Sequence, residues 1–120
     1  MTEYSITTDV RFGALERVDV HALADAVTEP WHNQTLCSVN ESVVRLGVVQ
    51  GEFHWHSHDE EDEFFFVVDG ELVIELEDRS VELRAGQGVT VPKGVRHRPV
   101  APRRTIMLMV ERNGIRPTGD

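Results

Sequence analysis

The sequence has one cysteine and no long apolar run, and both features limit what the protein can be. Cys37 stands alone, which excludes a disulfide within the chain and fits a reducing compartment. The longest uninterrupted apolar runs have five residues, far fewer than a membrane-spanning helix needs. The first ten residues have neither the basic start nor the apolar centre of a secretory signal. We therefore predict a cytoplasmic protein whose 120 residues form a single domain.

Basic residues are scarce relative to acidic ones. Twelve Lys and Arg stand against 21 Asp and Glu, which gives a formal net charge of −9. A chain with this balance repels phosphate groups, so we expect neither nucleic acid nor an anionic membrane surface as a partner. Five of the acids are consecutive, from Asp59 to Glu63, so the net charge says little about the charge inside a pocket.

The N-terminal part of the chain predicts an arm followed by one short helix. Residues 1–18 have little periodic pattern. Asp19 is a residue type that caps helices, and good helix formers follow it. The apolar positions of this helix lie on one face: Val20, Leu23, Ala24 and Val27. Pro30 ends it, so we expect an arm and helix within residues 1–33.

Beyond residue 33 the pattern changes to alternation and short apolar runs, which predict strands. Asp69-Gly70 lies between two of these runs and is a strong signal for a hairpin. Many short strands with frequent turns are typical of an antiparallel sandwich or barrel. The expected strands span 35–39, 42–50, 53–58, 63–68, 71–77, 80–83, 89–91, 96–100 and 105–111.

Three histidines, His54, His56 and His58, alternate along the predicted strand 53–58. Side chains at every second position of a strand point to the same face, so these imidazoles can converge. A carboxylate from the acidic run that follows would complete a site of the kind that binds transition metals. The alternative is a solvated surface turn of histidines and acids.

Two groups of residues have the spacing of the two conserved motifs of the cupin superfamily. The first motif is matched, with one residue fewer before its first histidine, by Gly51, His56, His58, Glu63 and Gly70. The second is matched by Gly86, Pro92, Gly94 and His97. The chain thus resembles the small single-domain cupins that are often labelled mannose-6-phosphate isomerase-like. The motif-bearing core covers about residues 42–111.

The resemblance implies an all-β antiparallel jelly-roll barrel with a metal at its centre. Carried over residue by residue, the implied metal ligands are His56, His58, Glu63 and His97. A slip in register would bring Asp62 or Glu61 to the position of Glu63. The chain departs from the second motif at Ala101, where these proteins usually have an asparagine, and this puts the local hydrogen bonding in doubt.

Other residues near the motifs allow more than one interpretation. His54 shares the predicted histidine row and is our candidate catalytic acid or base; the alternative is a hydrogen bond to a neighbour. By alternation, four residues point away from that row, into a second sheet or a dimer face: Phe53, Trp55, Met107 and Met109. Arg45 is expected in a surface salt bridge, with an approach to an anionic ligand as the alternative.

Three imidazoles and one carboxylate suit Fe, Mn, Ni, Zn or Cu as one divalent ion, and the sequence does not choose among them. We predict an oxygenase, isomerase or cyclase type of reaction on a small oxygenated organic anion. The alternatives are a non-catalytic cupin that binds or senses a small ligand, and a metal-free sugar-binding barrel. The resemblance also implies a homodimer.

Overall fold

The structure of the protein is a computed structural model that describes residues 4–119. Over these residues the chain forms eight strands and one short helix, which confirms the predicted all-β class with an N-terminal helix. In chain order these are β1 (Ser5–Thr7), α1 (Val20–Asp25), β2 (Trp31–Val39), β3 (Ser42–Glu52), β4 (Glu63–Asp69), β5 (Glu71–Leu76), β6 (Ser80–Arg84), β7 (Gly88–Val91) and β8 (His97–Arg112).

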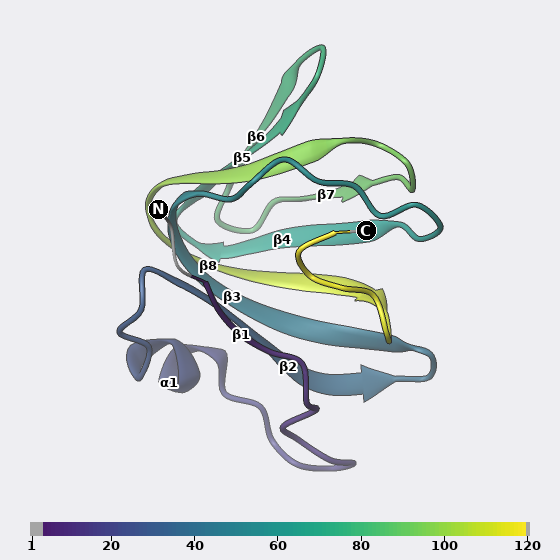
Figure 1. Cartoon of the computed structure of the whole chain (residues 1–120). Coiled ribbons are helices and arrows are strands. Elements are labelled where there is room, and N and C mark those ends of the chain that lie inside the picture. The colour runs from purple at the N-terminus through teal and green to yellow at the C-terminus, as the bar shows by residue number, and fades with distance from the viewer. Residues whose placement is uncertain (1–3, 120) are drawn as a thin grey trace.

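The long strand β8 organises the sheet (Figure 1). The strand order is β1-β2-β3-β8-β4-β7, and β5 pairs with both β8 and β6. Nearly all neighbours are antiparallel, but β1 runs parallel to β2. The N-terminal arm therefore contains a strand that the sequence did not predict. β8 also joins the two strands that we predicted separately at 96–100 and 105–111.

Two apolar cores lie on opposite faces of the sheet. The outer core packs α1 against β2, β3 and β8, with Ala24 and Leu46 fully buried. Asp19 caps α1 as predicted, since its Oδ1 accepts a hydrogen bond from the Ala22 N–H at 3.1 Å. The inner core fills the curve of the strands. It includes Ala101, which stands where the second cupin motif usually has an asparagine. Among residues 4–119 no helix has the length and hydropathy needed to cross a membrane.

The predicted hairpin at Asp69-Gly70 is wrong, because β4 and β5 do not pair with each other. Both pair with β8: β4 lies along residues 106–110 and β5 along 97–100. Gly70 therefore marks a kink where the chain stays beside β8. Its φ is +107°, and a Cβ there would lie 2.8 Å from the Cα of Thr105. Only glycine allows this close approach.

The predicted strand 53–58 is also wrong, and Pro99 explains why. The Phe53 N–H donates to the Pro99 carbonyl at 3.1 Å, but proline has no N–H to return the bond. Pairing resumes at one isolated bridge, His56 with His97, where the two residues exchange N–H···O bonds of 3.0 and 2.9 Å. Between these contacts the segment gains one residue relative to β8. This shift reverses the alternation, so Phe53 points into the inner core.

Met107 and Met109 also lie in the inner core, opposite to the predicted orientation. Ile106 and Leu108 face the outer core beside α1. Both faces of this part of β8 are apolar, so alternation predicts two faces but not which one faces the interior.

Candidate metal centre

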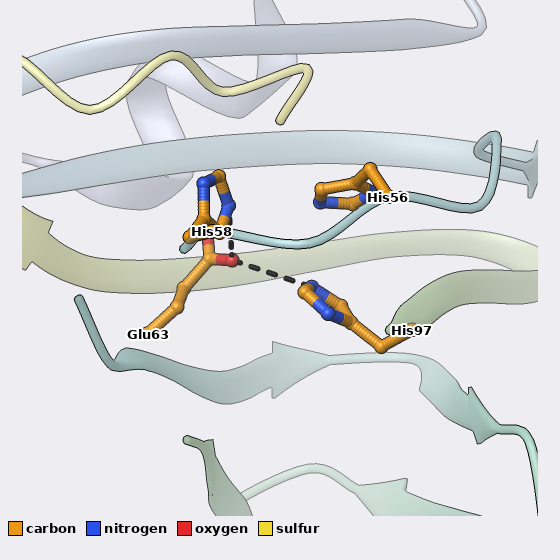
Figure 2. Close-up of side chains that lie close together, drawn as sticks. All are labelled: His56, His58, Glu63 and His97. Carbon is orange, nitrogen blue, oxygen red and sulfur yellow. Dashed lines mark ion pairs between the residues drawn. The ribbon is translucent and has the colours of Figure 1, made fainter. Parts of the chain in front are cut away.

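Four of the predicted site residues meet inside the curve of the strands (Figure 2). His56 and His58 come from the segment before β4, Glu63 opens β4, and His97 opens β8. One ligand atom from each residue lies within 4.8 Å of the ligand atoms of the other three. All four side chains are buried, with His97 only 1% exposed. The structure thus brings together the set His56, His58, Glu63 and His97.

Backbone carbonyls fix two of the imidazole rings. Nδ1 of His56 donates to the His54 carbonyl at 3.0 Å, and Nδ1 of His97 donates to the Val95 carbonyl at 2.9 Å. A carbonyl can only accept, so each ring has its proton on Nδ1 and presents Nε2 as a lone pair. Metal-binding histidines in proteins are oriented in the same way.

Two polar atoms at the centre, Oε1 of Glu63 and Nε2 of His97, are buried close to other members of the cluster. Oε1 of Glu63 lies 3.2 Å from Nε2 of His58 and 3.6 Å from Nε2 of His97. Neither Glu63 Oε1 nor His97 Nε2 has a hydrogen-bond partner among residues 4–119. A buried polar atom without a partner costs about 1–3 kcal/mol, and a cation at this point would remove that cost. The imidazole and carboxylate donors therefore fit a transition metal ion.

The protonation states of the cluster also suit a metal. Burial lowers the pKa of His56 from 6.5 to about 4, so this ring is neutral at pH 7. Burial alone would raise the pKa of Glu63, but protons on the facing nitrogens of His58 and His97 outweigh it and lower the pKa to about 2, and a bound cation would take the place of those protons. Neutral imidazole and ionised carboxylate are the forms that bind metals.

The acidic run divides as the sequence predicted. Glu63 is 4% exposed, whereas Asp59, Glu60 and Asp62 are on the surface and Glu61 is half-buried. Glu61 makes an ion pair with Arg112 at 3.1 Å. The register slip that would have brought Asp62 or Glu61 into the cluster does not occur.

A cavity adjoins the cluster and is largely apolar. Its volume is about 20 Å³, which is room for roughly one water molecule. The lining consists of Trp31, Asn33, Phe53, His56, Glu63, Phe65, Pro99, Met107, Met109 and Pro117. His56, Glu63 and Asn33 contribute polar side chains to it, and Trp31 adds an indole ring with one N–H donor.

The C-terminal segment, residues 113–119, turns back from the end of β8 (Figure 1) and reaches this cavity through Pro117. Pro117 lines the cavity, and the backbone at Gly119 lies against His56, where a Cβ would be 2.6 Å from the His56 Cβ. Nη2 of Arg45 donates to the Ile115 carbonyl at 3.1 Å. Pro117 and Gly119 thus occupy space directly beside the cavity and His56.

His54 lies outside the cluster, because the register shift before His56 turns it away from the predicted row. Its side chain is exposed, and Nε2 donates to the Thr118 carbonyl at 2.7 Å. The hydroxyl of Tyr4 lies 3.3 Å from its Nδ1. The hydrogen-bonding alternative thus describes His54 in this structure, and a catalytic role for it stays a prediction.

A buried ion pair beside the cluster is the main feature that the sequence did not predict. Arg45 and Glu111 are 2% and 1% exposed in their side chains, and Nε of Arg45 donates to the Glu111 carboxylate. The hydroxyl of Thr35 accepts a second bond from Arg45. The surface salt bridge expected for Arg45 is therefore wrong. The sequence did contain a signal for the burial of Arg45, because alternation places it on the same face of β3 as Val43 and Val49, which are buried.

The ion pair approaches the cluster through Glu111. Oε2 of Glu111 lies 4.0 Å from Nε2 of His58 and has no hydrogen-bond partner. Burial, and then the negative charge of Glu63, raise the pKa of Glu111, while Arg45 acts in the opposite direction. Arg45 thus holds a second carboxylate next to the four clustered residues.

The fold and the buried cluster define a cupin. Residues 42–111 match the cupin domain family, and the chain belongs to it. The chain is 41% identical over 91 residues to the uncharacterized protein YdbB of Bacillus subtilis (strain 168), a match that covers 75% of this chain and 80% of YdbB. It is 42% identical over 45 residues to the polyketide synthase CurC of Streptomyces cyaneus, covering 38% of this chain and 28% of CurC.

A solved structure agrees with the family assignment. The crystal structure of a cupin-2 domain containing protein from Shewanella frigidimarina NCIMB 400 superimposes with a TM-score of 0.75 and 30% sequence identity. The match covers 79% of this chain and 93% of that one. The resemblance predicted from the two motifs is therefore confirmed at the level of family and fold.

Proposed function

We propose that the protein is a metal-dependent cupin that binds a small oxygenated organic anion and catalyses an oxygenase, isomerase or cyclase type of reaction on it. One divalent transition metal ion would be held by His56, His58, Glu63 and His97. The observation that carries the proposal is the buried group of three imidazoles and one carboxylate beside an apolar cavity.

The charge of the site favours an anionic ligand. Three neutral imidazoles and one carboxylate leave a net charge of about +1 when a divalent cation is bound. The cation supplies positive charge that favours anionic oxygen ligands such as those of a keto acid. The cavity as it stands has room for about one water molecule, so a ligand would have to displace the segment 113–119 before Trp31, Phe53 and Phe65 could enclose its carbon skeleton. The similarity to a protein named polyketide synthase supports carbonyl compounds as the substrate class.

A non-catalytic binding or sensing function is the second candidate, and the cavity itself supports it. Apart from His56 and Glu63, both in the proposed metal site, the described lining has no acid or base. The earlier predictions of a homodimer, a cytoplasmic location, one domain over residues 1–120 and a mannose-6-phosphate isomerase-like activity stay predictions.

The test uses protein loaded with Co(II), whose visible absorption reports changes in its ligands, and pyruvate as the probe. We expect a saturable spectral change with pyruvate, a keto acid with two adjacent oxygen ligands, and a weaker change with acetate. Pyruvate methyl protons should exchange with deuterium faster than in a matched H56A/H97A sample if the protein moves protons. Binding without exchange would favour the sensing function, and oxygen uptake would favour an oxygenase. No spectral change with either acid would contradict the proposal.

The C-terminal segment should control access to the site. Deleting residues 116–120 removes Pro117 from the lining and the Thr118 carbonyl from His54, but it keeps the Ile115 carbonyl for Arg45. One hydrogen bond of about 1 kcal/mol corresponds to a factor of about five, so a chelator should remove the metal at least about fivefold faster. The measurement is the rate of Co(II) loss to excess EDTA.

The R116A variant is the matched control, because the Arg116 side chain is exposed and the backbone contacts of the segment remain. Its rate of metal loss should equal that of the unaltered protein. Equal rates for the deletion and the full chain would show that the segment does not limit access.

A further inference from the structure

Asn33 on β2 has an unexplained buried amide. The residue is 5% exposed, and its Oδ1 is buried with no hydrogen-bond partner. Asn33 also lines the cavity beside His56 and Glu63. An unsatisfied buried carbonyl oxygen is uncommon in native proteins, and it calls for a partner from outside the chain.

The sheet offers Asn33 no partner in its own row. Asn33 lies opposite Gly47 on β3, Gly47 lies opposite Met107 on β8, and Met107 lies opposite Val67 on β4. None of these three neighbours has a side-chain hydrogen-bond donor. A side chain at position 47 is also excluded, since a Cβ there would lie 2.8 Å from Cε of Met107. The row thus supplies no side-chain donor for Oδ1 of Asn33.

The next polar residue along the strand is already satisfied. Side chains at every second position of β2 point inward, and those of Trp31, Asn33 and Thr35 are buried. The Thr35 hydroxyl accepts a hydrogen bond from Arg45. Asn33 and Trp31 are therefore the residues of the described lining, outside the proposed metal ligands, whose side chains have a polar atom, and of these only Asn33 has an acceptor oxygen, which is buried without a partner among residues 4–119.

We propose that Asn33 recognises a hydroxyl group on the anion that the metal centre binds. The Oδ1 atom can only accept, so the complementary ligand group must donate an O–H. The ligand class is then a small hydroxylated keto acid or a related hydroxycarbonyl anion. This assignment depends on the proposed function, since the metal centre holds the anionic end while Asn33 selects the other end. Asn33 acts as a specificity residue and not as a metal ligand.

Two probes that differ by one hydroxyl test the assignment. Co(II)-loaded protein is titrated with pyruvate and with 3-hydroxypyruvate, and the dissociation constants are compared. We expect hydroxypyruvate to bind about tenfold more tightly, a factor typical of one buried hydrogen bond. In N33L the preference should fall to about one. M109L changes an apolar part of the same lining and should alter both affinities by a similar factor.

Thermal unfolding of the metal-free protein gives a readout that does not depend on the ligand. If a side chain stabilises the fold by packing or hydrogen bonding, replacing it lowers the Tm. Asn33 instead has a buried oxygen without a partner among residues 4–119, and N33L removes that oxygen. We therefore expect N33L to keep or raise the Tm, as happens when a binding residue is replaced by an apolar one. N33A serves as the second variant if leucine does not fit.

The outcomes separate this assignment from the proposed function. Loss of the hydroxyl preference in N33L with an unchanged or higher Tm supports it. Equal binding of the two acids by the unaltered protein, or a preference that persists in both Asn33 variants, overturns it and leaves Asn33 with a buried water. Failure of both acids to bind overturns the proposed function and this assignment together. A lower Tm in N33L and N33A identifies Asn33 as structural.

Discussion

Replacing His56 and His97 together with alanine should abolish metal binding. Two of the four clustered residues are removed, and the two that remain, His58 and Glu63, come from one stretch of chain. Replacing one residue that hydrogen-bonds to a metal ligand already lowers the affinity for the metal about 10–100-fold. The loss of two ligands should therefore lower the affinity by more than this range. We expect about one metal ion per chain in protein purified without a histidine tag, and none in H56A/H97A. Elemental analysis measures both.

The matched control for this loss is H54A. His54 is the third histidine of the same stretch, but its ring bonds to the Thr118 carbonyl and lies outside the cluster. The carbonyl of residue 54 that holds the His56 ring belongs to the backbone and survives the substitution. H54A should therefore keep its metal. Metal retained by H56A/H97A, or lost from H54A alone, would show that the cluster is not the binding site.

The four clustered residues and His54 together show how far the sequence could predict the site. The four clustered residues were predictable because their spacing follows two motifs, and the structure brings them together. The position of His54 was not predictable from alternation. Its strand is interrupted where Pro99 cannot return a hydrogen bond, and the one-residue shift that follows reverses the orientations of Phe53 and His54 relative to His56, whereas Trp55 stays outside the inner core as predicted.

The sequence predicted where the strands lie along the chain better than it predicted which strands pair with each other. The strand boundaries of β3, β4 and β5 differ from the predicted ones by one or two residues. The predicted hairpin at Asp69-Gly70 failed because the sequence of a turn is local, whereas β8 is long enough to pair with β4 and β5 in succession. Which strand a segment pairs with depends on residues far along the chain.

Arg45 and Glu111 show the same limit at the site. They are separated by 66 residues in the chain, and nothing in the local pattern links them. Each lies on a strand where alternation places a charged residue among apolar ones. A charge on a buried face predicts a partner of opposite charge, but only the pairing of β3 with β8 identifies it.

Replacing Arg45 with methionine should therefore destabilise the protein strongly. Methionine fills most of the volume, but it leaves the Glu111 carboxylate and the Thr35 hydroxyl without the donors that Arg45 provides. Removal of one partner from a buried ion pair costs about 3–5 kcal/mol of unfolding free energy. Urea denaturation of the metal-free protein, followed by circular dichroism, measures this change.

The double variant R45M/E111L separates the ion pair from simple packing. A buried ion pair replaced as a whole by apolar residues is often neutral or stabilising, because the cost of removing both charges from water disappears. We expect R45M/E111L to recover most of the stability that R45M loses. A loss in the double variant as large as the sum of the two single losses would mean that the residues act independently. In that case Arg45 would stabilise the barrel through its bond to the Ile115 carbonyl, and the C-terminal segment would be its main partner.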